Sequence, residues 1–84
     1  MILADQIRHY VKIELIEPAR KRGEKLINVN AGDVHQRMKL ENRMPAVCSA
    51  LDAGKFLDYA RVTLISRNGP LQGGTAEWVF GLEM

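Results

Sequence analysis

The sequence contains a single cysteine, few aromatic residues and no long uninterrupted hydrophobic run. One cysteine, Cys48, excludes a framework of internal disulfide bonds, and its apolar surroundings indicate an inert buried thiol rather than a nucleophile. The first fifteen residues carry charges at short intervals, among them Asp5 and Arg8, which is not the pattern of a signal peptide or a membrane span. We therefore expect a reducing, cytoplasmic setting.

The sequence also lacks the patterns that carry catalysis or ligation. It has no glycine-rich phosphate loop after a strand, no nucleophile beside an evident base, and no paired carboxylates at a useful spacing. Asp33 and His35 are two residues apart, which places them on different faces of a helix, and only His9 and Cys48 offer further soft ligands. We expect no enzyme activity, no metal site and no cofactor.

The length of 84 residues allows one domain with one modest core, and we expect a single domain over residues 1–84. The formal net charge of +2 is not a strong signature of nucleic-acid binding. The basic residues are nevertheless concentrated in segments 18–25 and 37–67, while the remainder of the chain is acidic on balance. This distribution favours a localised basic surface.

The N-terminal third predicts a helix followed by a short strand. Apolar residues from Leu3 recur with helical periodicity to about Ile16, with Asp5 and Arg8 largely on the opposite side. Pro18 disfavours helix at the preceding residue, so we expect an interruption and a further short turn at 19–22. Residues 25–29 then have the pattern of a strand.

The middle of the chain predicts two short helices joined by a tight turn. Asn30 can cap a helix that runs from Ala31 to near Met38. Asn42 can cap a second helix, with Pro45 in its first turn, that runs to residue 53. Gly54 is then expected to stop this helix in the left-handed conformation, with residues 55–57 following as a helix extension or a loop.

The C-terminal part predicts a β-hairpin over residues 61–83. Val62 and Leu64 alternate with polar or outward residues, and Ala76, Trp78 and Phe80 do the same in the second strand. Residues 68–74 between the strands are rich in Gly, Pro and Asn, which is turn chemistry. The connection is longer than a tight hairpin needs, so we expect it to project as a loop.

The order helix, strand, helix, turn, helix, strand, loop, strand resembles the winged-helix family over nearly the whole chain. The specific part is residues 30–53, which resembles a helix-turn-helix because its apolar positions suit two short helices that cross steeply around a turn. These positions are Val34, Met38, Leu40, Val47, Ala50 and Leu51. Segments Pro18–Glu24 and Ala31–His35 also resemble small prokaryotic domains of unassigned function.

The resemblance implies an α+β fold, with a three-helix core, a short strand and a C-terminal hairpin wing, that binds double-stranded DNA. Residues 43–53 would be the recognition helix in the major groove, and residues 68–74 the wing. Base-edge positions would be Arg43, Met44, Pro45, Ser49 and Asp52. Among them only Arg43 carries a group that commonly reads a base, so phosphate contacts should dominate.

The positions implied for phosphate contact suggest roughly four to six anchors and therefore a strongly salt-dependent affinity. They are Arg37, Lys39, Asn42, Arg43, Lys55, Arg67 and Gln72. We accordingly expect a small transcriptional regulator or an architectural DNA-binding protein. One continuous positive face that joins the arginines and Lys55 would favour DNA, whereas scattered charge would favour a partner protein.

Several alternatives stay open at this level. The surface at residues 44–46 is apolar enough for a protein–protein interaction module instead of a DNA reader. Trp78 is either a core residue or part of a stacking platform for single-stranded nucleic acid. Residues 20–22 are either a phosphate-binding patch or a solvated helix end. Ile13 and Ile16, on the first predicted helix (from Leu3 to about Ile16), either form a homodimer contact or pack under the hairpin strands.

Overall fold

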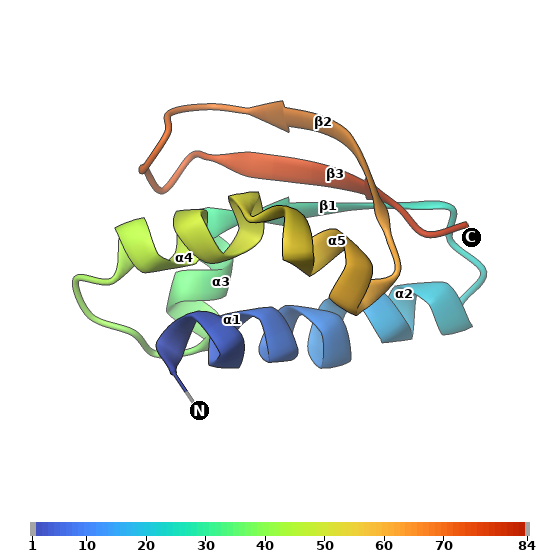
Figure 1. Ribbon diagram of the computed structural model, residues 1–84, viewed down its shortest axis with the longest axis horizontal. Coiled ribbons are helices and arrows are strands. Elements are labelled where there is room, and N and C mark those ends of the chain that lie inside the picture. Colours follow the sequence, from blue (N-terminus) through green and yellow to red (C-terminus); the bar gives the residue numbers. More distant parts are fainter. Residues whose placement is uncertain (1, 84) are drawn as a thin grey trace.

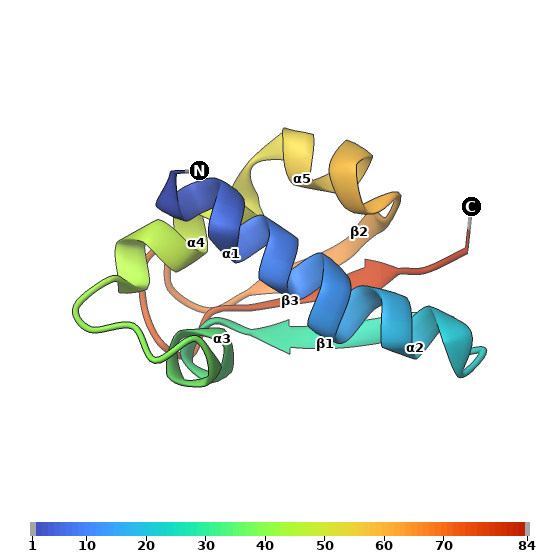
Figure 2. The same cartoon turned by 90° about the horizontal axis from the view of Figure 1, so that it is seen from below.

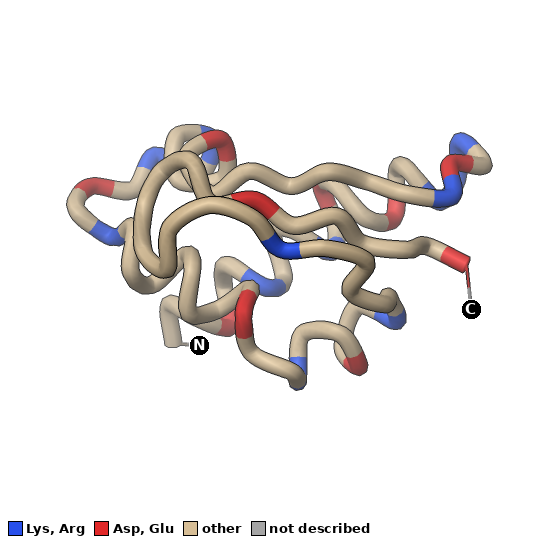
Figure 3. The backbone as a smooth tube through the Cα atoms, turned by 90° about the horizontal axis from the view of Figure 1, so that it is seen from above, with Lys and Arg blue, Asp and Glu red and all other residues tan. Residues whose placement is uncertain are grey.

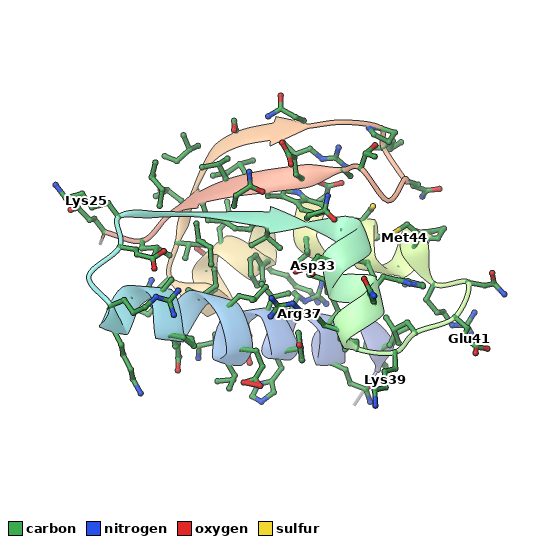
Figure 4. The ribbon with its side chains drawn as sticks, turned by 180° about the vertical axis from the view of Figure 1, so that it is seen from behind. Lys25, Asp33, Arg37, Lys39, Glu41 and Met44 are labelled. Carbon is green, nitrogen blue, oxygen red and sulfur yellow. The ribbon has the colours of Figure 1, made fainter. Side chains whose placement is uncertain are left out.

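The computed structural model describes residues 2–83, which form an α+β fold with a three-stranded antiparallel sheet. The helices lie against one face of the sheet, as seen from the front and from behind (Figures 1 and 4). In chain order the elements are α1 (Leu3–Val11), η1 (Lys12–Ile16), α2 (Glu17–Lys21), β1 (Leu26–Asn30), α3 (Ala31–Arg37), α4 (Met44–Asp52), α5 (Gly54–Ala60), β2 (Thr63–Asn68) and β3 (Glu77–Gly81).

The N-terminal helix does not stop where Pro18 predicted an interruption. α1, η1 and α2 run as one continuous rod, and η1 is a π-helical segment immediately before Pro18 (Figure 2). Glu17 keeps right-handed helical angles, with φ −66° and ψ −41°. A local change of helical register accommodates a residue that has no N–H to donate, so the proline perturbs the helix without ending it.

The predicted strand and the helix after it are confirmed. β1 covers Leu26–Asn30, and the side chain of Asn30 accepts a hydrogen bond of 2.9 Å from the backbone N–H of Asp33. This bond satisfies one of the free donors of the first turn of α3, as an N-cap should.

The boundaries of the second helix of the pair differ from the prediction at both ends. Asn42 is not the N-cap: it has a left-handed φ of 53°, and Arg43 occupies the cap position without a side-chain capping bond. Gly54 does not stop the helix in the left-handed conformation. Instead Ala53 adopts an extended conformation (φ −71°, ψ 132°) between α4 and a further helix, α5, of which Gly54 is the first residue.

The hairpin is confirmed, and β3 is its central strand, since the strand order is β1-β3-β2. Trp78 and Phe80 of β3 point into the core, as their alternation predicted. The alternation of inward and outward residues that we predicted for β2 does not hold beyond Val62. A bulge between Leu64 and Ser66 shifts the register of β2 against β3. Leu64, which pairs with Phe80 on this edge strand, is 46% exposed instead of buried.

One core lies between the sheet and the helices. Trp78 and Phe80 are fully buried, and the Phe80 ring packs 5.3 Å from that of Phe56 in α5. Ile16 is also fully buried, so it belongs to this core, while Ile13 is 39% exposed. No helix within residues 2–83 is long and apolar enough to cross a membrane.

Candidate nucleic-acid interface

The turn between α3 and α4 has a defined conformation at one end of the molecule. Lys39 and Asn42 have left-handed φ angles of 57° and 53°, and Leu40 is half-buried against the core. Nε2 of His35 accepts a hydrogen bond of 3.2 Å from the backbone N–H of Arg43. His35 therefore holds the start of α4, a role that no local pattern in the sequence indicates.

This turn brings together three of the cations predicted to contact phosphate. The side chains of Lys39 and Arg43 are exposed and make no hydrogen bond or ion pair within the described part of the chain. Nε of Arg37 lies 3.0 Å from Asp33 in an exposed ion pair on α3. Lys39 and Glu41 project from the turn end, while Lys25 lies at the opposite end of the molecule (Figure 4).

The outward face of α4 carries few groups that can read a base. Pro45, Ser49 and Asp52 are exposed on this face, while Val47, Cys48, Ala50 and Leu51 are buried. Met44 is half-buried beside the hairpin loop. Burial raises the pKa of the Cys48 thiol, and its Sγ lies 3.8 Å from the carbonyl of Gly73, as expected for an unreactive cysteine.

Arg67 does not project toward solvent, although we predicted a phosphate contact from the wing. It forms a bidentate pair with Asp52 of α4, with both N–O distances at 2.9 Å, and its guanidinium lies 5.1 Å from the Trp78 ring centroid. Its remaining donors bind the carbonyls of residues 68–71. All five N–H groups of the guanidinium thus have acceptors within the molecule.

Asp52 is the other half of this arrangement, and its role also differs from the predicted base contact. It accepts a 2.7 Å hydrogen bond from Nε1 of the Trp78 indole in addition to those from Arg67. The hydrogen bonds from Arg67 hold the pKa of the Asp52 carboxyl below its usual value. The three side chains fasten the hairpin loop to the C-terminal end of α4.

The remaining predicted contacts lie apart from the turn. Gln72 and Ser49 border a shallow hollow of about 340 Å³ between α4 and the hairpin loop. Lys55 lies on α5 and lines a different hollow together with Asp5. Basic and acidic residues are interspersed around the backbone (Figure 3). Lys55, in the hollow with Asp5, and Arg67, paired with Asp52, do not continue the basic cluster of the turn.

The basic segment at the end of α2 contains one residue with a clear structural role. Arg20 donates hydrogen bonds to the carbonyls of Leu82, Ala60 and Arg61, at 3.3, 3.4 and 2.7 Å. Arg22 pairs with Glu24 at 2.6 Å. Arg20 was not distinguishable from its neighbours in the sequence, because its acceptors are backbone carbonyls some 40 to 60 positions away.

Arg8 is a second residue whose position the helical pattern misassigned. It was placed on the polar side of the first helix, yet it is only 6% exposed. It donates a hydrogen bond of 3.1 Å to the carbonyl of Ala50 in α4 and one of 2.9 Å to the carboxylate of Asp5. Its hydrogen bonds allow the charge to be buried, and no local signal in the sequence indicates them.

Comparison of the chain with models of protein families, with curated proteins and with solved structures found no match. Within residues 2–83, no group of three or more His, Cys, Asp or Glu side chains is placed to hold a metal ion.

Proposed function

We propose that the chain is a winged-helix protein that binds double-stranded DNA through the turn between α3 and α4 and the adjoining first half of α4. The order of elements and the β1-β3-β2 sheet support a winged-helix arrangement. The observation that carries the DNA proposal is the presence of two exposed cations, Lys39 and Arg43, on a turn of defined conformation, whose side chains have no hydrogen-bond or ion-pair partner among residues 2–83.

The proposed contact is smaller than the sequence suggested. Arg67 is fully engaged within the molecule and Lys55 lies elsewhere, so the anchors reduce to Lys39, Arg43 and, after release from Asp33, Arg37. Two to three phosphates correspond to a slope of roughly −2 to −3 in a plot of log K against log salt. With Pro45 and Ser49 facing outward, base discrimination should be weak.

Fluorescence anisotropy with a labelled mixed-sequence duplex tests this proposal. We expect binding at low salt, and each of Lys39→Ala and Arg43→Ala should lower the salt slope by about 0.9. Lys21→Ala, which removes an exposed lysine of α2, is the matched control and should change nothing. Absence of binding at low salt, or equal behaviour of all three variants, would show that the turn does not contact DNA.

The second candidate function is a protein-interaction module with the same fold. The interspersed charges favour it, as does the exposed Leu71 at the hairpin loop, which is 76% exposed close to the outward face of α4. A partner would contact Pro45 of the apolar segment 44–46 together with Leu71. Self-association through the N-terminal helical rod would depend on Ile13 of η1, since Ile16 belongs to the core, and a monomeric mass by light scattering would argue against it.

A further inference from the structure

A hollow between α1 and α5 lies apart from the proposed DNA contact. It has a volume of about 350 Å³ and is lined by Asp5, Arg8, Lys55 and Tyr59. This volume is near the lower end of the range of about 300–1,000 Å³ that is typical of small-molecule pockets. The size therefore suits a small organic molecule and not a cofactor or a polymer.

The charges in this hollow leave a positive excess. The Arg8 side chain is 7% exposed, and its pairing with Asp5 at 2.9 Å lowers the pKa of that carboxyl, with a further contribution from the charge of Lys55. Asp5 is therefore ionised at neutral pH and balances Arg8. Lys55 makes no ion pair within residues 2–83, so the charges of Asp5, Arg8 and Lys55 together leave the hollow with a net positive charge.

Tyr59 provides a flat apolar surface beside that charge. Its hydroxyl is hydrogen-bonded to Nδ1 of His9 at 2.8 Å, and Nζ of Lys12 lies 4.7 Å from its ring centroid. The contacts come from α1 and from the first residue of η1 and orient the ring, which nevertheless remains 42% exposed. An oriented, exposed aromatic ring next to an unpaired lysine combines an apolar contact with a site for an anion.

We propose that this hollow binds a small aromatic monocarboxylate, with its carboxylate at Lys55 and its ring against Tyr59. Asp5 and the carbonyl of Ala50 hold two nitrogens of Arg8, so Lys55 supplies the positive excess that the carboxylate would meet. The proposal does not depend on DNA binding, because its residues are separate from Lys39 and Arg43.

An NMR titration of the full chain with benzoate tests the site directly. We expect saturable shifts of backbone amides near residues 5–9 and 55–59. Benzamide, which keeps the ring and loses the charge, and acetate, which keeps the charge and loses the ring, should each bind about tenfold more weakly. Equal affinity for benzoate and benzamide, or shifts that are spread over the surface without saturation, would overturn the proposal.

Variants locate the two contacts. Lys55→Gln should weaken benzoate binding about tenfold, because it removes a charge-assisted hydrogen bond and keeps a polar side chain of similar length. Tyr59→Leu should also weaken binding, and Lys21→Gln on α2 is the matched control without effect. All three sites are exposed, so the variants should fold, which the amide spectrum verifies in the same experiment. Unchanged binding by Lys55→Gln would contradict the assignment.

Discussion

At the scale of single residues, two polar side chains that the sequence singled out for DNA make their contacts within the molecule instead. Asp52 and Arg67 were predicted as a base contact and a phosphate contact, yet they bind each other and Trp78. They are 15 positions apart, and no spacing rule connects them. By contrast, the exposed cations of the turn, Lys39 and Arg43, remain in the positions that suit the proposed role.

The Asp52 network should make stability depend on acid pH. Because the folded pKa of Asp52 lies below its usual 3.8, its stabilising contribution is fully present above about pH 4 and is lost as the pH falls through the folded pKa. Urea unfolding of the wild type, monitored by fluorescence, should therefore show a stability that falls between pH 5 and pH 3. Asp52→Asn should be less stable at pH 5 and should show a smaller fall.

The exposed Asp58, which makes no ion pair in the described part of the chain, supplies the comparison. Asp58→Asn should keep the wild-type pH dependence. If Asp52→Asn and wild type lose the same stability between pH 5 and pH 3, the Arg67 pair is not a source of acid sensitivity.

At the scale of elements, local chemistry predicted some features correctly and missed others, among them the N-cap of α4, which is Arg43 and not Asn42. The Asn30 cap and the alternation in β3 are both confirmed, because each depends on contacts within a few residues or on one buried face. The predictions from Pro18 and Gly54 are wrong. A proline disfavours helix at the residue before it but does not have to end the helix, and a glycine permits a left-handed φ but does not have to adopt it. The surrounding packing decided both cases.

Two glycines that look equivalent in the sequence should respond oppositely to alanine. Gly54 begins α5 without a left-handed φ, and an added Cβ would meet nothing within 4 Å, so Gly54→Ala should stabilise by about 0.4–1 kcal/mol through lower unfolded-state entropy. Gly69 has φ +90°, and its Cβ would lie 2.7 Å from the carbonyl oxygen of Thr75. Gly69→Ala should destabilise by more than about 1 kcal/mol.

Urea unfolding of both variants and the wild type measures the two changes in the free energy of unfolding, provided that the m-values of the three proteins are equal. A loss of stability in Gly54→Ala would mean that residue 54 needs the conformational freedom of glycine, as the sequence first suggested.

At the scale of the whole molecule, Arg20 joins the first quarter of the chain to the last. Its guanidinium binds the carbonyls of Ala60 and Arg61 at the end of α5 and that of Leu82 after β3. The backbone N–H of Leu82 in turn donates a hydrogen bond of 2.9 Å to the carbonyl of Lys25. This end of the molecule is thus closed by hydrogen bonds between segments that are distant in sequence.

Removal of the Arg20 side chain should lower the free energy of unfolding, although Arg20 lies in a run of basic residues. Arg20→Ala should destabilise the fold by about 1–2 kcal/mol, because several partly buried carbonyls lose a charged donor. Lys21→Ala, one position along, should change the free energy of unfolding by less than about 0.5 kcal/mol. Similar small effects in both variants would assign the whole run to a solvated helix end.

Local periodicity and capping predicted the α+β composition, the cap of α3, the apolar sides of α3 and α4, and the alternation in β3, but they left two alternatives for Trp78. Tertiary contacts place Trp78 in the core, bury Arg8, hold Arg20 and Arg67 within the molecule and make α5 a separate helix. The physical reason is that these outcomes depend on carbonyls and carboxylates supplied by distant segments, which no local pattern encodes.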